Sequence, residues 1–274
     1  MESPEATKAW LDWYKAIGVD EALSDHALNR LTDVAEADAP VKAPPPPPSQ
    51  RLPPAQQAQA PALAPGAGQA GADAAAIAAK CATLAELAEA VAAFTGCPLR
   101  TPATRTVFSD GAPDAPVMVI GEAPGAEEDR LGKPFVGPSG RLLDQMLAAI
   151  GLDRQRNVYI TNVIFWRPPA NRAPTPIETA ICLPFVERQI ALLRPRVLIL
   201  SGSVSARTVL SRTDGITKFR GRWMTDSNVP VLENIATIAT FHPSYLLRSP
   251  GQKRETWKDF LLVKMKLQEL GILT

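Results

Sequence analysis

Four short apolar segments in the last two thirds of the chain constrain its fold more than any other feature. They cover residues 117–120, 158–161, 197–200 and 235–240. Each is short and rich in apolar or β-branched residues, as is typical of a buried strand, and segments with helical spacing separate them. Strands that alternate with helices predict a parallel sheet covered on both faces. We therefore predict the α/β class: a three-layer α/β/α sandwich with a short, mainly parallel central sheet.

The segments between these strands carry signals for helix starts and stops. Ser139 can cap a helix that ends near Gly151. Thr175 and Glu178 form a capping box with Pro176 at the first helical position, which predicts a helix that runs to about residue 193. Further helices are expected at 74–93, 203–210 and 255–270, and a hairpin is expected at 219–232.

The first third of the chain differs in composition from the rest. Aromatic and apolar residues at helical spacing predict a helical segment within residues 1–37. Ten of the 27 prolines lie between Pro40 and Pro65, and such a stretch forms neither a helix nor a sheet ladder. We predict a disordered linker at 38–73 that offers a site for a protein partner, with a ligand for an SH3-type domain as the sharper alternative. Residues 74–274 then form the main domain, with a leading helix.

Several features limit where the protein acts. No run of about 18 apolar residues occurs, so we expect no membrane span. The N-terminus lacks a basic stretch followed by an apolar one, so we expect no secretory signal. Three cysteines, Cys81, Cys97 and Cys182, do not suggest a disulfide scaffold. We predict a cytoplasmic protein and a monomer.

Charge is distributed unevenly between the two parts of the chain. Residues 1–96 hold 6 Lys and Arg against 12 Asp and Glu, whereas residues 97–274 hold 23 against 16, a net charge of +7. A basic domain is typical of proteins with a polyanionic partner, although ordinary surface charge explains the same numbers.

Polar residues follow each predicted strand at its carboxyl end. Gly121-Glu122 follows the first strand, Asn162 the second, Ser201-Gly202 the third and His242 the fourth. Ligands of open α/β sheets bind at this edge. The sequence therefore predicts one site built from all four segments.

Five motifs in this part of the chain have an order and a spacing that match a known family. They read GEAPG (121–125), GKPFVG (132–137), ITN (160–162), RPPANR (167–172) and FHPSYLL (241–247). From Cys97 to about Leu270 the chain resembles the iron–sulfur type (family 4) of uracil-DNA glycosylases. The resemblance implies a uracil-DNA glycosylase-like fold and monofunctional hydrolysis of the glycosidic bond of uracil in DNA, which leaves an abasic site. No lysine in these motifs is placed to form a Schiff base, so lyase activity is not expected.

The residue types in these motifs suit that reaction. Uracil must leave the base stack before its glycosidic bond can be reached, and Phe135 offers a ring for the flipped base. The amide of Asn162 can donate to one edge atom of uracil and accept from another, which excludes cytosine. His242 can donate to uracil O2 as negative charge develops there. The remaining expected substrate contacts are Gly121, Ala123, Pro124, Gly125 and Ser244.

The group that orients the attacking water has three candidates. Ala123 occupies a position where other uracil glycosylases carry an aspartate, a lack that family 4 shares. Glu122, Glu128 and Asn171 are the polar groups close to it in the motifs. Glu122 can instead brace the loop, and Glu128 can serve a helix N-terminus.

The resemblance also implies residues that contact DNA. Arg167, Arg172 and Arg248 are candidates for phosphate contacts, with solvated surface arginines as the alternative. Leu246 or Leu247 is a candidate wedge that enters the minor groove, with core packing as the alternative for each.

The resemblance implies a [4Fe-4S] cluster held by four cysteines, and two of these are missing. Cys97 and Cys182 stand at two of the ligand positions, whereas Phe94 and Trp166 stand at the other two. Two thiolates are too few for such a cluster. We predict no cluster, no other metal and no cofactor, with a cluster bound in part by other ligands as the alternative.

Three other functions stay open at this point. A related glycosylase can act on another deaminated or modified base. A uracil-DNA binding protein can hold its target without turnover, although the histidine-bearing insertion of one such relative is absent from residues 129–134. Finally, an interaction protein can keep the fold after losing catalysis.

Overall fold

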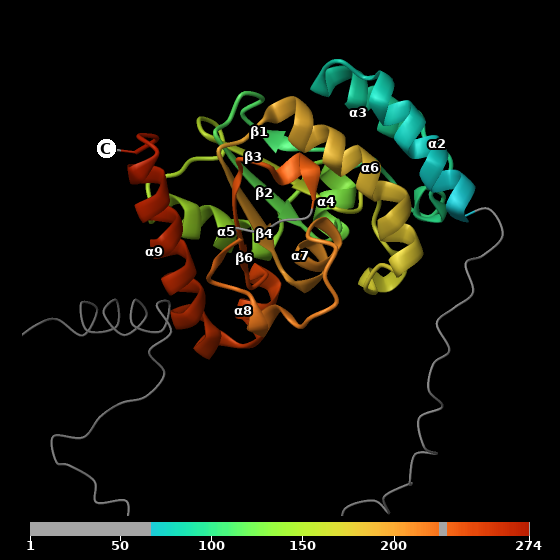
Figure 1. Ribbon diagram of the computed structural model, residues 1–274. Coiled ribbons are helices and arrows are strands. Elements are labelled where there is room, and N and C mark those ends of the chain that lie inside the picture. The colour runs from blue at the N-terminus through green and yellow to red at the C-terminus, as the bar shows by residue number, and fades with distance from the viewer. Residues whose placement is uncertain (1–66, 225–228, 274) are drawn as a thin grey trace, which may run out of the picture. The chain divides into compact units, whose positions relative to one another are not determined.

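The structure of the protein is a computed structural model that describes residues 67–224 and 229–273. Its sheet has the strand order β1-β3-β2-β4-β6-β5 (Figure 1). The four inner strands are parallel and each is five residues long: β2 (Val117–Gly121), β3 (Val158–Asn162), β4 (Val197–Ser201) and β6 (Ala236–Thr240). The two edge strands, β1 (Asp110–Gly111) and β5 (Trp223–Met224), are antiparallel to their neighbours. The predicted short, mainly parallel sheet is confirmed.

Both faces of the sheet are buried, which explains why apolar residues of its inner strands point to both sides. Val117 and Val119 point to one face, where α5 (Pro138–Ala148) and α9 (Lys253–Glu269) pack. Met118 and Ile120 point to the other, where α2 (Ala67–Lys80), α3 (Leu84–Ala93), α6 (Pro176–Leu193) and α7 (Ser203–Val209) pack. Figure 1 shows α9 and α6 on opposite sides of the sheet. This arrangement confirms the three-layer α/β/α sandwich.

The leading helix differs from the prediction in its start and its continuity. α2 begins at Ala67, inside the predicted linker 38–73, and a second helix, α3, follows a break at residues 81–83. Alanine-rich sequence favours the helix, and α2 packs against α6. Thr83 then caps α3 by accepting a hydrogen bond from the amide of Glu86 at 3.1 Å. The predicted segment 1–37 and residues 38–66 lie outside the described residues.

Two predicted helix starts have different outcomes. The capping box is confirmed: Thr175 Oγ1 accepts from the amide of Glu178 at 3.2 Å, and the Glu178 carboxylate accepts from the amide of Thr175 at 2.7 Å. The Ser139 cap is wrong, because α5 begins at Pro138 with Gly137 as its N-cap. Proline at the first helical position has the φ angle that a helix needs, so the helix starts two residues earlier than a Ser139 cap would place it.

The predicted hairpin at 219–232 is wrong within the described residues. β5 pairs antiparallel with β6, at the edge of the main sheet, rather than with a partner inside the segment. Pro230 opens a short 3-10 turn, Pro230–Leu232, because it has no amide to donate to a second strand. No helix of the described part is long and apolar enough to cross a membrane.

Candidate active site

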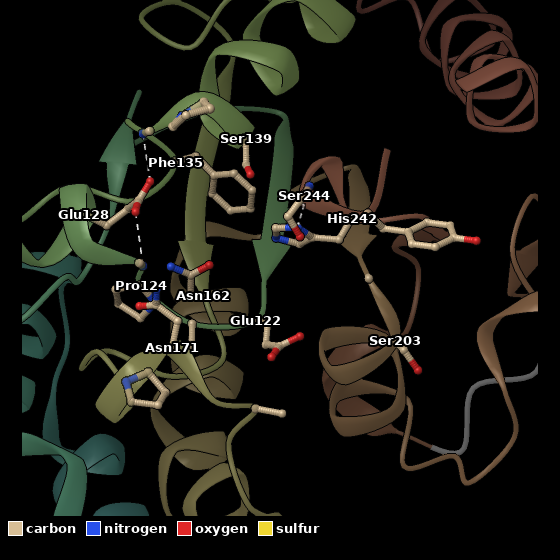
Figure 2. Close-up of a pocket in the computed structure, with 18 of the residues that line it drawn as sticks. Glu122, Pro124, Glu128, Phe135, Ser139, Asn162, Asn171, Ser203, His242 and Ser244 are labelled. Atoms are coloured by element: carbon tan, nitrogen blue, oxygen red, sulfur yellow. Dashed lines mark hydrogen bonds between the residues drawn. The ribbon is translucent and has the colours of Figure 1, made fainter. Parts of the chain in front are cut away.

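A cleft of about 860 Å³ opens at the carboxyl ends of the parallel strands. The strand register places Gly121 beside Asn162 across β2 and β3. Gly202 and His242, which follow β4 and β6, also line the cleft. Two short helices lie at this edge, α4 (Ala126–Leu131) and α8 (Pro243–Arg248). The segments that the sequence placed at this edge therefore form one cleft (Figure 2).

Phe135 presents its ring inside this cleft from an unusual backbone conformation. Its φ angle is +53°, its side chain is buried, and its ring centre lies 5.4 Å from that of His242. Gly121 provides the space, because a Cβ there would lie 2.5 Å from the Phe135 ring and would also collide with Asn162 Oδ1. The ring is thus placed as one wall of a slot for a planar group.

Asn162 ends β3 with its side chain inside the same slot. Only 2% of the residue is exposed, and no hydrogen bond of its amide group is found within the described part of the chain. Figure 2 shows the side chains of Asn162, Phe135 and His242 pointing toward one another. A buried side-chain amide with a donor and an acceptor available is suited to bind a polar ligand.

His242 is the N-cap of α8, and its ring has a defined tautomer. Its Nδ1 atom accepts from the amide of Ser244 at 3.1 Å and lies 2.8 Å from Ser244 Oγ. A backbone amide only donates, so the proton of the neutral imidazole is on Nε2. Burial, together with the positive charge of Arg248, lowers the pKa of His242 to about 4. Near neutral pH the ring is therefore an uncharged donor.

Gly202 lets the ring of His242 approach β4. Its φ angle of +99° is one that side chains rarely allow, and a Cβ there would lie 3.0 Å from the Cβ of His242. Of the predicted substrate contacts, Ala123, Pro124 and Gly125 line the cleft, as does Ser244.

The three candidates for orienting water differ in how free their polar atoms are. Glu122 lines the cleft, and burial raises the pKa of its carboxyl group while the charge of Arg248 partly opposes that rise. Asn171 is exposed with φ at +54°, and its Oδ1 accepts from Arg167 Nε at 2.7 Å. Of these two, Glu122 has the freer oxygen atoms.

Glu128 binds backbone amides with both of its oxygens. Oε1 accepts from the amides of Val136 (3.0 Å) and Gly137 (2.9 Å), and Oε2 accepts from that of Gly125 (3.1 Å). It therefore serves the N-terminus of α4, as one of the alternatives expected, and also links two loops. Because both of its oxygens are occupied by these bonds, Glu128 is better suited to hold the loops than to orient water.

With this geometry established, comparison with known proteins identifies the family. The family model described as "Uracil DNA glycosylase superfamily" matches residues 108–265, more than half of the chain. The chain belongs to the uracil-DNA glycosylase superfamily.

The most similar relatives include enzymes named type-4 uracil-DNA glycosylase. That of Thermotoga maritima is 40% identical over 167 residues, which cover 60% of this chain and 82% of the relative. That of Archaeoglobus fulgidus is 38% identical over 174 residues, which cover 60% and 83%. A type-5 uracil-DNA glycosylase of Pyrobaculum aerophilum is 30% identical over 153 residues, which cover 51% and 66%.

All the predicted DNA contacts lie within the residues that match the family model. The structure gives them different surroundings. Leu246 is 1% exposed, so the alternative of core packing applies to it, whereas Leu247 is 46% exposed and stays the candidate wedge. Arg172 donates two hydrogen bonds to the buried carboxylate of Glu178, at 2.9 and 2.6 Å, so its charge is already paired. Arg248 is exposed at the end of α8.

Cys97 and Cys182 lie together in the core of this superfamily member. Their sulfur atoms are 4.0 Å apart, and both residues are buried. The hydrogen bond between them lowers the pKa of the Cys97 thiol and raises that of Cys182. In the described residues, no group of three or more His, Cys, Asp or Glu is placed to hold a metal ion.

Phe94 and Trp166 fill this part of the core with aromatic rings. The Phe94 ring packs edge-on against that of Phe185, with 5.1 Å between ring centres. Trp166 is 1% exposed, and its indole nitrogen donates to Thr106 Oγ1 at 3.1 Å. The side chains at this position therefore do not fit a four-thiolate cluster.

Sequence reasoning missed some residues at the site. Ile216 and Thr217 line the cleft from a short 3-10 helix, Ile216–Lys218, that carries no recognisable motif. Arg154 donates to the carbonyl oxygens of Pro134 and Phe135, although it lies outside every motif. No sequence signal marks them, because each is brought to the site by the tertiary fold.

Proposed function

We propose that this chain hydrolyses the N-glycosidic bond of uracil in DNA and leaves an abasic site. The observation that carries the proposal is the meeting of three groups in one cleft: the Phe135 ring, the Asn162 amide, for which the described residues offer no hydrogen-bond partner, and the neutral ring of His242. The names of the type-4 and type-5 relatives support the same reaction. The substrate partner is uracil-containing DNA.

Recognition of the base depends on Phe135 and Asn162. A flipped uracil stacks on the Phe135 ring. The Asn162 amide nitrogen donates to O4, and its Oδ1 accepts from the N3–H group. Cytosine presents a donor in place of O4 and no proton on N3, so both hydrogen bonds would fail.

His242 stabilises the leaving base. Cleavage leaves negative charge on uracil, and the Nε2–H group donates toward O2 as that charge develops. Because the pKa of the ring is lowered to about 4, His242 contributes a hydrogen bond rather than a formal positive charge at neutral pH. Ser244 maintains this tautomer through its bonds to Nδ1.

Glu122 orients the water that attacks the sugar, and its carboxylate also faces the positive charge that develops there. Asn171, held by Arg167, is a second polar group at the same opening. Leu247 and Arg248 project from α8, where the leucine can replace the flipped base in the stack and the arginine can contact phosphate.

We further infer that the enzyme works without an iron–sulfur cluster. Cys97 and Cys182 supply two thiolates, and the buried Phe94 and Trp166 supply none. Iron and acid-labile sulfide, measured in protein purified without oxygen, should both be far below one equivalent. Cys97→Ser and Cys182→Ser should keep most of the activity. Stoichiometric iron and sulfide would overturn this inference.

The reaction is tested with end-labelled oligonucleotides that carry uracil opposite guanine, opposite adenine or in a single strand. Strand cleavage after alkali, dependent on uracil and absent from thymine controls, is the expected result. Parallel substrates with hypoxanthine or a modified uracil test the rival base specificity. Tight binding of uracil DNA without release of the base would instead indicate a binding protein.

The remaining expectations stay predictions from the sequence. These are a monomeric, cytoplasmic protein, and a protein partner for the proline-rich segment. The division into 1–37, 38–73 and 74–274 also stays a prediction, except that α2 begins at Ala67, inside the predicted linker.

A further inference from the structure

Two side chains of opposite charge hold the loop that carries Phe135. Arg154 donates from Nη1 to the carbonyl oxygen of Pro134 (2.9 Å) and from Nη2 to that of Phe135 (2.7 Å). Glu128 Oε1 accepts from the next two amides, those of Val136 (3.0 Å) and Gly137 (2.9 Å). Four successive residues are thus bound through their backbones, two by the guanidinium and two by the carboxylate.

Both side chains are themselves fixed to other elements. The side chain of Arg154 is 11% exposed and pairs with Asp110 of β1 (3.0 Å) and Asp144 of α5 (2.9 Å). Glu128 belongs to α4, and its second oxygen accepts from the amide of Gly125 in the first motif. The loop is therefore tied to the sheet edge, to α5 and to the loop of the first motif.

The conformation of the loop explains why it needs these bonds. Phe135 has φ at +53°, a backbone conformation that residues other than glycine, asparagine and aspartate rarely adopt. Gly140 makes room, because a Cβ there would overlap the carbonyl group of Phe135. This conformation directs the ring toward His242. Without the bonds, more common backbone conformations would move the ring away from that position.

We propose that Arg154 and Glu128 are positioning residues that hold the Phe135 ring where the flipped base stacks. The inference rests on the proposed function, which it deepens. Arg154 is not among the residues that line the cleft, so it acts through the loop and not by contact with the base.

The proposal is tested by a double-mutant cycle on the rate of uracil release with enzyme in excess. Arg154→Lys keeps the charge near Asp110 and Asp144 but loses the two-pronged donor, so the rate should fall by roughly 10–100-fold. In a Phe135→Ala background the same change should have almost no further effect, since the ring is already gone. Glu128→Gln should show the same pattern: a slower rate in the wild-type background and almost no further effect in the Phe135→Ala background. Equal losses in both backgrounds would mean a general structural role and would overturn the proposal.

A matched control is available in Arg188, which donates through two nitrogens to the carbonyl oxygen of Cys81 on the far side of α6. Arg188→Lys makes the same chemical change at a backbone carbonyl outside the cleft. It should leave the rate of uracil release unchanged.

Amide hydrogen exchange provides a readout that does not depend on turnover. In Arg154→Lys, a peptide covering residues 132–141 should exchange faster, whereas one covering 158–162 should not change. Unchanged exchange in 132–141 would refute the inference even in an active enzyme. A wild-type protein that releases no uracil would refute the proposed function instead, so the two failures are distinguishable.

Discussion

Asn162 shows how much of the site a single residue can carry. The sequence predicted its position, because it ends a strand within a matching motif, and the structure leaves its amide without a hydrogen bond in the described part of the chain. Glu128 shows the opposite case. Its motif suggested several roles, and its bonds to three amides became visible only once the loops were placed. Contacts of this kind join residues whose backbone geometry no sequence pattern encodes.

Asn162→Asp should lower the rate of uracil excision by at least about a hundredfold, because a carboxylate repels O4 and leaves it without a donor. Rates measured with enzyme in excess check this. Gln155→Glu makes the same change at an exposed amide and should have no effect. Normal excision by Asn162→Asp would remove Asn162 from base recognition.

The pH dependence should separate Glu122 from His242. The pKa of Glu122 is raised above its usual value and that of His242 is lowered to about 4. As pH falls, Glu122 is therefore protonated first, and the wild-type rate should decline at a pH above 4.5. Glu122→Gln should be slower but keep a constant rate until the pH approaches 4, where His242 takes up a proton. A wild-type decline centred near 6.5 that Glu122→Gln retains would show an unperturbed histidine and contradict this assignment.

At the scale of elements, the strands and most helices could be predicted because burial imposes clear patterns. Short segments rich in apolar or β-branched residues marked all four inner strands, and the capping box at Thr175 marked the start of α6. The edges of the sheet could not be predicted, since β1 and β5 have only two residues each and depend on their neighbours for pairing. The short α8 was also missed, because six residues carry too little periodicity.

Two adjacent leucines of α8 should respond differently to truncation. Leu246→Ala should lower the free energy of unfolding by about 2–5 kcal/mol, because its side chain is buried. Leu247→Ala should leave stability nearly unchanged and instead reduce excision from double-stranded DNA more than from single strands, where no stack must be opened. Chemical denaturation and parallel rate measurements test both. The reverse pattern would contradict the assignment of Leu247 as the wedge.

Trp166 should contribute strongly to the core near Cys97 and Cys182. Trp166→Ala is expected to lower the free energy of unfolding by about 3–5 kcal/mol, since its ring is 1% exposed. Trp257→Ala, at a residue that is 41% exposed, is the matched control and should change it by less than about 1 kcal/mol. Similar small losses for both variants would show that the Trp166 ring is not a major packing element.

At the scale of the whole molecule, the residues found to line the cleft all lie between Glu122 and Arg248, in the described part of the unit Ala60–Thr274. A protein that begins at residue 60 should therefore excise uracil from short oligonucleotides at the full-length rate. Truncation at residue 74 is a different test, because it removes half of α2, which packs on α6, and should reduce stability. A folded protein from residue 60 without activity would show that the first 59 residues take part in the reaction.

The central claim is that the protein releases uracil from DNA by way of His242 and Asn162, and the most direct measurement is the free base itself. Wild-type protein, His242→Ala and Asn162→Asp should be incubated in excess over a uracil-containing duplex, and the released base identified by mass spectrometry. We expect stoichiometric uracil from the wild type, with a much lower rate but intact DNA binding for His242→Ala. Absence of uracil in the wild-type reaction, or equal rates for all three proteins, would contradict it.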